Sequence, residues 1–247
     1  MTDETSVDAP AGTAGGLGRN ERKTVAGPLH TIILLLVIAS VSALGYFSVQ
    51  RAIGTQNPHR LVFYGLTMAW EWATVGYIYW GVRRHGVSFS ELVGGSWKGK
   101  RFFVDLGIAF AFWVAALVVL GIVAFLLHSR GMNEAARAIA PRTPVESFLW
   151  VCVSVTAGIC EETIFRGYLQ KQFAAWTQNG VVGLVLSALI FGAGHIYQGL
   201  KPATVITVYG LMFGTLAEVR RSLRPGMMTH AFHDTAAGLL IRFIPRA

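Results

Sequence analysis

About seven apolar stretches, most of them about 20 residues long, recur along the chain between short connections that carry arginine, lysine or other polar residues. This is the length that an α-helix needs to cross a hydrocarbon core of about 30 Å. In lipid, a helix satisfies its backbone hydrogen bonds within one segment, whereas an isolated strand leaves them unpaired. The pattern therefore predicts an all-α fold, a polytopic bundle of transmembrane helices.

The expected spans divide the chain into three regions. We expect a disordered N-terminal tail over residues 1–28, N-terminal transmembrane helices over residues 29–144, and a motif-bearing membrane domain over residues 145–243. About seven spans fit the pattern, with six or eight as alternatives, because the ends of apolar stretches are uncertain by a few residues. The spans are expected at residues 29–49, 61–82, 104–127, 145–173, 181–197, 203–219 and 227–243.

Composition supports lipid as the solvent of this chain. Hydrophobic residues make up 53% of the sequence and charged residues 14%, whereas ordinary soluble domains carry about a quarter charged residues. The net charge is +8, but the basic residues stand singly or in pairs at the ends of apolar stretches. This distribution favours membrane anchoring over a nucleic-acid partner. Cys152 and Cys160 fall within one apolar stretch, so we expect no disulfide framework.

The N-terminal tail differs from a secretory signal sequence. Asp3, Glu4 and Asp8 place negative charge where a signal peptide is positive. The first apolar stretch is longer than a typical signal core, and no small-residue cleavage site follows a basic start. We therefore expect this stretch to remain as a helix of an integral, multi-pass protein of the cell membrane.

Ionisable residues within the apolar stretches indicate where chemistry takes place. Such a residue at bilayer depth costs about 3 kcal/mol on insertion, so its default interpretation is functional. The first half of the chain has few, namely Glu71 and Asp105. The last four expected spans contain Glu161, Glu162, Arg166, His195, His230, His233 and Asp234. The asymmetry places the candidate site in the C-terminal half.

The fourth expected span contains two adjacent glutamates. Glu162 and Arg166 lie one helical turn apart on one face and can form an internal ion pair. Glu161 points about 100° away from Glu162, so its carboxylate is left free to face a cavity. A free carboxylate in such a site is suited to act as a general base. The alternative is that both glutamates only pair with basic residues of neighbouring helices.

Histidines mark the fifth and seventh expected spans. His195 follows Gly192 and Gly194, which allow another helix or an extended peptide to approach closely. Taken alone, such a histidine is more often a packed core residue than a catalyst. His230 and Asp234 are spaced i, i+4 and share one helix face. Together they can hold a carbonyl oxygen, a water molecule or a metal, or Asp234 can fix the tautomer of His230.

The same residue types raise the question of a metal. Histidines and carboxylates are usual zinc ligands, so Glu161, His195 and His230 form a candidate zinc-binding set. Their spacing does not match H-E-x-x-H, in which two histidines lie one turn apart, so the metal is a weaker inference than hydrolysis. His233 has no assigned role. Glu71 is expected to be a packing residue paired across helices, with a substrate groove as the alternative.

Three motifs resemble the CAAX-protease and bacteriocin-processing family, also called the Abi family. The family's marks are E-E-x-x-x-R, F-x-x-x-H, and H-x-x-x-N or H-x-x-x-D, in that order. In this sequence they read Glu161-Glu162 to Arg166, Phe191 to His195, and His230 to Asp234. Each motif alone is weak, but the ordered set on apolar helices is specific. The resemblance covers residues 145–243, the last two fifths of the chain.

The resemblance implies a multi-helix intramembrane endopeptidase of the CAAX prenyl protease type. By this resemblance, Glu161 and His195 activate the attacking water, and His230 and Asp234 stabilise the oxyanion. Glu162 and Arg166 then brace the site. The resemblance leaves two mechanisms open, one that depends on a metal and one that works through glutamate alone.

Two features depart from this scheme. An ionised Asp234 cannot donate a hydrogen bond to an oxyanion as the asparagine of the eukaryotic members can, so Asp234 is protonated, orients His230 or helps to bind a metal. His195 also falls late in its span and His230 early in a span of the same direction. Straight helices place such residues at different depths, so tilt, a broken helix or other boundaries must reconcile them.

The leading hypothesis is hydrolysis of a peptide bond in a membrane-associated peptide or protein, with the lipid bilayer as the surroundings and no nucleic-acid partner. The first alternative is a non-catalytic membrane scaffold or immunity-type partner that retains the family frame. A second alternative is a small ion-coupled carrier, since buried carboxylates and histidines also relay protons. A carrier would distribute its binding elements over two halves, and this sequence does not.

Overall fold

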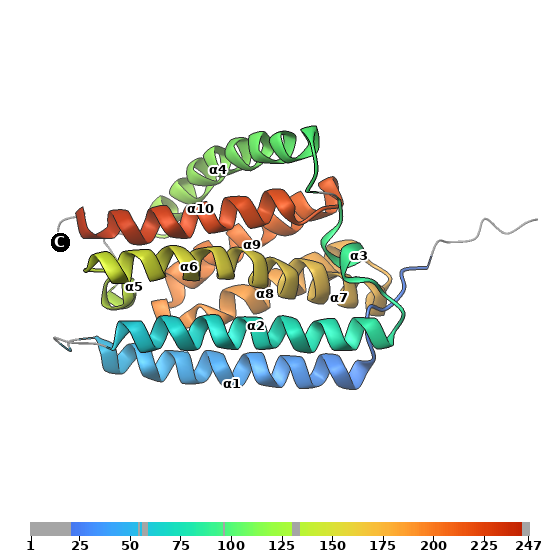
Figure 1. The fold of residues 1–247 in the computed structure, drawn as a ribbon, viewed down its shortest axis with the longest axis horizontal. Helices are drawn as coiled ribbons and strands as arrows, with labels where there is room; N and C mark the ends of the chain where they lie inside the picture. Colours follow the sequence, from blue (N-terminus) through green and yellow to red (C-terminus); the bar gives the residue numbers. More distant parts are fainter. Residues whose placement is uncertain (1–20, 54, 56–58, 96, 130–133, 244–247) are drawn as a thin grey trace, which may run out of the picture.

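A computed structural model of the chain describes residues 21–53, 55, 59–95, 97–129 and 134–243. Helices and short connections make up these residues, and no strand occurs among them (Figure 1). The predicted all-α fold is confirmed. Both cysteines are free, as expected.

The helices agree with the expected spans within a few residues. The N-terminal half forms α1 (Pro28–Ala52), α2 (Arg60–Arg84), α3 (Phe89–Val93), α4 (Lys100–Leu126) and α5 (Glu134–Ile139). The C-terminal half forms α6 (Pro144–Glu161), η1 (Glu162–Leu169), α7 (Gln170–Thr177), α8 (Gly180–Gly194), η2 (Ile196–Gln198), α9 (Leu200–Arg220), α10 (Arg224–Leu240) and η3 (Ile241–Phe243).

Four helices are long and apolar enough to cross a membrane. They are α1, α4, α9 and the continuous helix Pro144–Thr177, which joins α6, η1 and α7. The helix α8 is apolar but shorter. These helices support an integral membrane protein, while the number of about seven spans stays a prediction.

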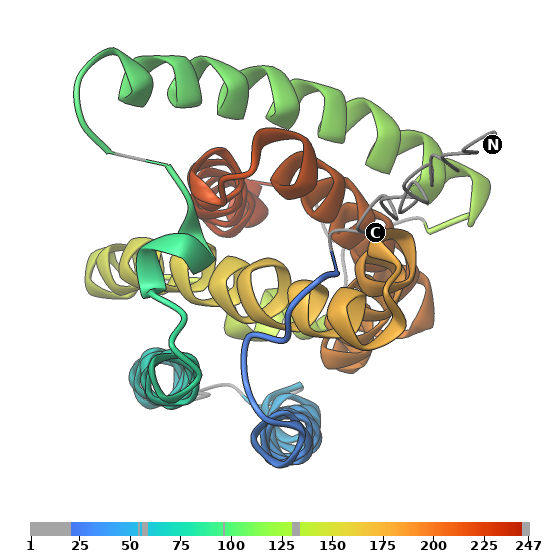
Figure 2. The ribbon, with the colours of Figure 1, turned by 90° about the vertical axis from the view of Figure 1, so that its right-hand side faces the viewer.

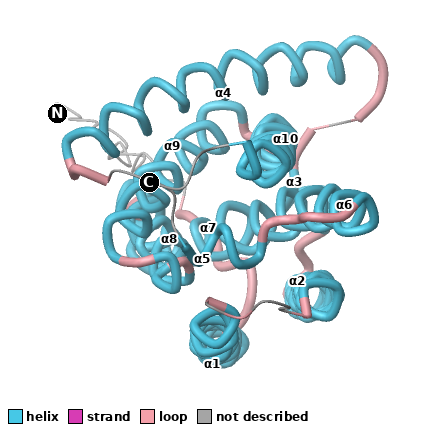
Figure 3. Tube along the Cα trace, turned by 90° about the vertical axis from the view of Figure 1, so that its left-hand side faces the viewer, coloured by secondary structure: helices cyan, strands magenta, loops and turns pink. Residues whose placement is uncertain are grey.

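The bundle has α1 and α2 on one side and α4 on the opposite side, with α6 and α10 between them (Figures 1 and 2). The helix α6 packs against α10 and α2, and α8 packs against α7 and α9. The view from the other end shows α4 crossing over α9 and α10 (Figure 3), both of which it contacts. Large apolar side chains of α4, such as Phe103 and Phe125, are exposed and suit contact with lipid.

Local sequence signals fix the ends of the helices around the site. Thr143 and Glu146 form a capping box at the start of α6, with Pro144 in the first turn. Gln178 adopts the left-handed conformation that ends α7, with φ of 52°. Asn179 then caps α8 by accepting hydrogen bonds from the backbone of its first turn. The antiparallel pair of α7 and α8 is therefore built on a tight turn.

Part of the predicted tail lies within the described residues. Residues 1–20 lie outside them. Just before α1, Val25 and Ala26 are buried, and their backbone N–H groups donate to the side-chain oxygen of Gln172, at 2.8 and 3.2 Å. The Gln172 amide in turn donates to the carbonyl of Ala26. These bonds tie the entry of α1 to α7.

Candidate active site

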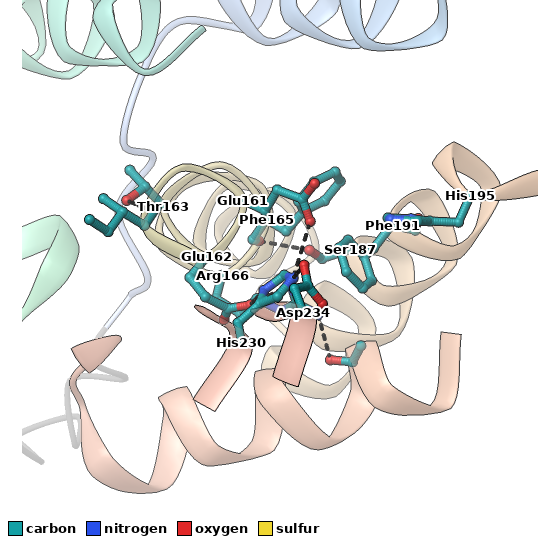
Figure 4. A network of polar contacts seen from close by, with 12 residues as sticks. Glu161, Glu162, Thr163, Phe165, Arg166, Ser187, Phe191, His195, His230 and Asp234 are labelled. Carbon is teal, nitrogen blue, oxygen red and sulfur yellow. Dashed lines mark hydrogen bonds and ion pairs between the residues drawn. The ribbon is translucent and has the colours of Figure 1, made fainter. Parts of the chain in front are cut away.

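The two adjacent glutamates stand where the helix changes its geometry. Glu161 is the last residue of α6, and Glu162 is the first residue of η1, a π-helix of eight residues. A π-helix has wider turns than an α-helix and occurs often at functional sites. Ser187 of α8 donates a hydrogen bond of 2.7 Å to the carbonyl of Phe165, which also accepts from the backbone N–H of Gln170, so Ser187 links the widened segment to α8 (Figure 4).

The predicted ion pair between Glu162 and Arg166 is present and fully buried. Their charged atoms lie 3.0 Å apart, and each side chain is 1% exposed. Arg166 also donates to the carbonyl of Gly210 at 3.2 Å, and its guanidinium lies 4.3 Å from the centre of the Phe191 ring. Arg166 therefore joins η1 to both α8 and α9.

His230 brings the carboxylates of the first and third motifs together (Figure 4). Its Nδ1 donates to Glu162 Oε1 at 3.1 Å, since an ionised carboxylate only accepts. Its Nε2 lies 3.5 Å from Glu161 Oε2 and 3.5 Å from Asp234 Oδ2. The imidazole is buried and packs on the ring of Phe213. The predicted shared face of His230 and Asp234 is present, and it points at both glutamates.

His195 stands apart from this cluster. The expected span 181–197 places His195 inside a helix. In the structure α8 ends at Gly194, and His195 is the next residue. Its Nδ1 donates to the carbonyl of Phe191 at 2.9 Å, which leaves Nε2 of the neutral ring as an acceptor. Figure 4 shows its ring on the far side of Phe191 from His230.

The turn between α7 and α8 sets the relative depths of Glu161 and His195. Glu161 and His195 are equally far along the chain from Gln178, one before it and one after it. Since the helices on the two sides of this turn are antiparallel neighbours, the two side chains come to the same level of the bundle. The ring of Phe191, one turn before His195, lies 6.1 Å from the ring of His230. His195 itself lies about one helical turn beyond the residue that meets His230, so the mismatch is reduced to about one turn.

A cavity of 190 Å³ connects the first two motifs. Glu161, Phe165, Phe191 and His195 line it from α6, η1 and the end of α8. Residues of α1 and α2 form the other wall, among them Glu71. The second wall comes from outside the three motifs. The sequence predicts Glu71 mainly as a packing residue, so its place in the cavity wall was not expected. The sequence did contain a signal for a functional role of Glu71. A carboxylate inside an apolar stretch costs free energy on insertion into the bilayer, so its default interpretation is functional.

A larger cavity of 580 Å³ adjoins the first one. Val49 and Phe63 line both. Most of the other residues around the larger cavity are apolar, such as Leu44, Phe47 and Leu66. Both cavities therefore lie along α1 and α2.

The described residues do not form a metal site. No group of three or more histidine, cysteine, aspartate or glutamate side chains among them is arranged to hold a metal ion. Within the zinc-binding set suggested by residue type, Glu161 and His230 lie near each other, whereas His195 lies on the far side of Phe191 from His230 (Figure 4). His233 packs beside Tyr209, with ring centres 5.1 Å apart. The predicted zinc-binding set is therefore not assembled among the described residues.

One of the comparisons with known proteins agrees with this geometry. A family model described as Type II CAAX prenyl endopeptidase Rce1-like matches residues 143–236. The match begins at the cap of α6 and includes all three motifs. No curated protein and no solved structure matches the chain. The segment that carries the cluster around His230 is therefore similar to the CAAX-protease family, as the three motifs predicted.

Proposed function

We propose that this protein is an intramembrane endopeptidase that hydrolyses a peptide bond of a membrane-associated peptide or protein. The observation that carries the proposal is the position of Glu161, which lines a cavity together with His195 and lies 3.5 Å from His230. A base and an acceptor then line one cavity, and a donor lies beside the base.

In the proposed reaction, Glu161 takes a proton from water while His195 Nε2 accepts a hydrogen bond from the same molecule. The water oxygen attacks the carbonyl carbon of the substrate, and the carbonyl oxygen becomes an oxyanion. The doubly protonated imidazole of His230, whose Nδ1–H donates to Glu162, stabilises this charge through its Nε2–H group. The C–N bond then breaks and the proton held by Glu161 passes to the leaving nitrogen. The products are a carboxylic acid and an amine, which become a carboxylate and an ammonium group when the second proton of the water is transferred.

The other motif residues hold these groups in position. Glu162 accepts from His230 Nδ1 and is itself held by Arg166, so the imidazole cannot rotate without breaking a buried bond. Asp234 lies 3.5 Å from His230 Nε2, which favours a role in orienting His230 over direct donation to the oxyanion. No step of this proposal passes through a metal.

The substrate is proposed to be embedded in, or attached to, the cell membrane. The larger cavity along α1 and α2 is lined mostly by apolar residues and shares Val49 and Phe63 with the cavity of Glu161, so it suits apolar groups near the scissile bond. A CAAX-type substrate carries such groups at its end. The family match is the reason to place this class first among the substrates to be tested.

Cleavage in heavy-oxygen water tests the proposal. Purified protein in lipid nanodiscs is incubated in H₂¹⁸O with a set of membrane-associated peptides, including prenylated ones, and the products are analysed by mass spectrometry. We expect cleaved peptides with one ¹⁸O atom in the new C-terminal carboxyl group, because water supplies that oxygen. Folded protein that cleaves none of the peptides, while it still binds its cellular partners, would favour the scaffold interpretation.

The contact between α6 and α10 provides a second prediction. A Cβ atom at Gly158 would lie 2.7 Å from the Met227 carbonyl and 2.8 Å from the Ala231 backbone nitrogen. Gly158→Leu should therefore push α10 away and separate His230 from Glu162. We expect cleavage to fall about a hundredfold, as misplacement of a catalytic group by 1 Å can do. Gly121→Leu on α4 is the matched control, since nothing lies within 4 Å of its Cβ position. Equal activity of the two variants would contradict the proposed geometry.

A further inference from the structure

Glu71 is a buried carboxylate that the proposed reaction does not use. It lies near the middle of α2, outside the three motifs, and only 5% of its surface is exposed. It lines the same 190 Å³ cavity as Glu161 and His195. An ionisable group at this depth is costly, so its presence calls for a partner.

The described part of the chain contains no such partner for Glu71. Its Oε2 atom is buried and makes no hydrogen bond there, and none of the described ion pairs includes this carboxylate. Asp105, the other carboxylate in an expected span of the N-terminal half, behaves differently. It lies 2.6 Å from Arg224 and 3.7 Å from Arg220. The expected pairing of Glu71 across helices is therefore not found among the described residues.

The cavity around Glu71 has the chemistry of a site for a basic side chain. Glu71 and Glu161 both contribute carboxylates to it, and none of the described residues that line it is lysine or arginine. Much of the remaining wall is apolar, including Ile38, Val41 and Val49 of α1. Lysine and arginine bury their aliphatic stems against such surfaces and present a charge at the tip. A carboxylate of the substrate would instead meet like charge.

We infer that Glu71 is a specificity-determining residue that binds a lysine or arginine side chain of the substrate next to the scissile bond. This inference rests on the proposed endopeptidase function. The incoming cation supplies the partner that Glu71 lacks, and the pairing places the neighbouring peptide bond beside Glu161. Substrates with a neutral or acidic residue at that position leave the Glu71 carboxylate unpaired and bind less well.

A peptide series measures this preference. Membrane-associated peptides that differ only at one position near the scissile bond carry lysine, norleucine or glutamate there, and the position is moved along the peptide. We expect native protein to cleave the best lysine peptide at least about tenfold faster, by kcat/KM, than its norleucine match, since a buried charge pair contributes this much or more. The difference should lie mainly in KM.

Substitutions at Glu71 assign the preference to this residue. Glu71→Gln keeps the shape of the side chain and should abolish the preference for lysine, while Glu71→Lys should favour the glutamate peptide. Glu91→Gln is the control, because Glu91 is exposed on α3 and does not line the cavity. If Glu71→Gln lowers kcat equally for all peptides and leaves their order unchanged, Glu71 serves the chemical step and the inference is wrong.

A binding measurement separates this inference from the proposed reaction. Fluorescence anisotropy of labelled peptides is recorded with Glu161→Gln, which is expected not to cleave them, with and without Glu71→Gln. Tighter binding of the lysine peptide that disappears with Glu71→Gln supports the inference even if native protein cleaves no peptide. Equal binding of lysine and norleucine peptides overturns it even if native protein cleaves both.

Discussion

Replacement of Glu161 by glutamine is expected to lower kcat for peptide cleavage about a thousandfold, the usual contribution of a general base. Glutamine has nearly the same size and keeps hydrogen-bonding atoms beside His230, so the bundle should stay folded. It cannot take a proton from water, however, and the attack on the substrate carbonyl then lacks its base. KM should change little, because the proposed role of Glu161 is in the chemical step.

Single-turnover cleavage in nanodiscs measures this effect without interference from product release. Glu218→Gln is a suitable control, because this glutamate is exposed on α9 and pairs only with exposed Arg22 at 3.4 Å among the described residues. Circular dichroism and gel filtration establish that both variants fold. Cleavage by Glu161→Gln at more than about a tenth of the native rate would require another base.

Replacement of Arg166 by methionine is expected to destabilise the protein by about 3–5 kcal/mol. Methionine fills part of the space of the arginine but leaves the Glu162 carboxylate buried without its partner. The carbonyl of Gly210 also loses its donor. Breaking a buried ion pair from one side is costly for this reason, whereas an exposed pair contributes about 0–1 kcal/mol. Arg22→Met, which removes the exposed pair with Glu218, is the matched control.

Unfolding of purified protein by SDS in mixed micelles measures the loss of stability in Arg166→Met and in Arg22→Met. The double variant Glu162→Gln with Arg166→Met removes the unpaired charge, so it should recover a large part of the lost stability. It should not recover cleavage, because His230 Nδ1 then donates to a neutral amide rather than to a braced carboxylate. If Arg166→Met is as stable as Arg22→Met, the buried pair does not hold η1 to the bundle.

The sequence predicted most of the helices and the partners within each motif, because both depend on spacing along one segment. Apolar stretches predicted the seven longer helical segments within a few residues, and the i, i+4 spacings placed Arg166 with Glu162 and Asp234 with His230. Gly192 was also correctly interpreted as a point of close approach. A Cβ atom there would lie 2.9 Å from the carbonyl of Ala203 on α9.

Contacts between segments were harder to predict, since they depend on where each helix ends and turns. The capped turn at Gln178 sets Glu161 and His195 at one level of the bundle. Predicting this requires the position of the turn and the end of α8 at Gly194, which the apolar stretches locate only within a few residues. The packing of α2 against α6, which brings Glu71 to the cavity, leaves no periodic signal in the sequence. Helical angles also predict a free carboxylate at Glu161, whereas in the structure Nε2 of His230 lies 3.5 Å from it.

The π-helix after Glu161 fixes the number of residues that this part of the chain must contain. Hydrogen bonds of a π-helix connect residues five apart, so the segment holds more residues per turn than the α-helices before and after it. Loss of a single codon here would let the segment wind as an ordinary α-helix, and the residues within it would move relative to their neighbours. Glu161 and Arg166 would then no longer face the same neighbours. Insertions and deletions accepted in the loops of this gene are therefore expected to be absent between these two residues.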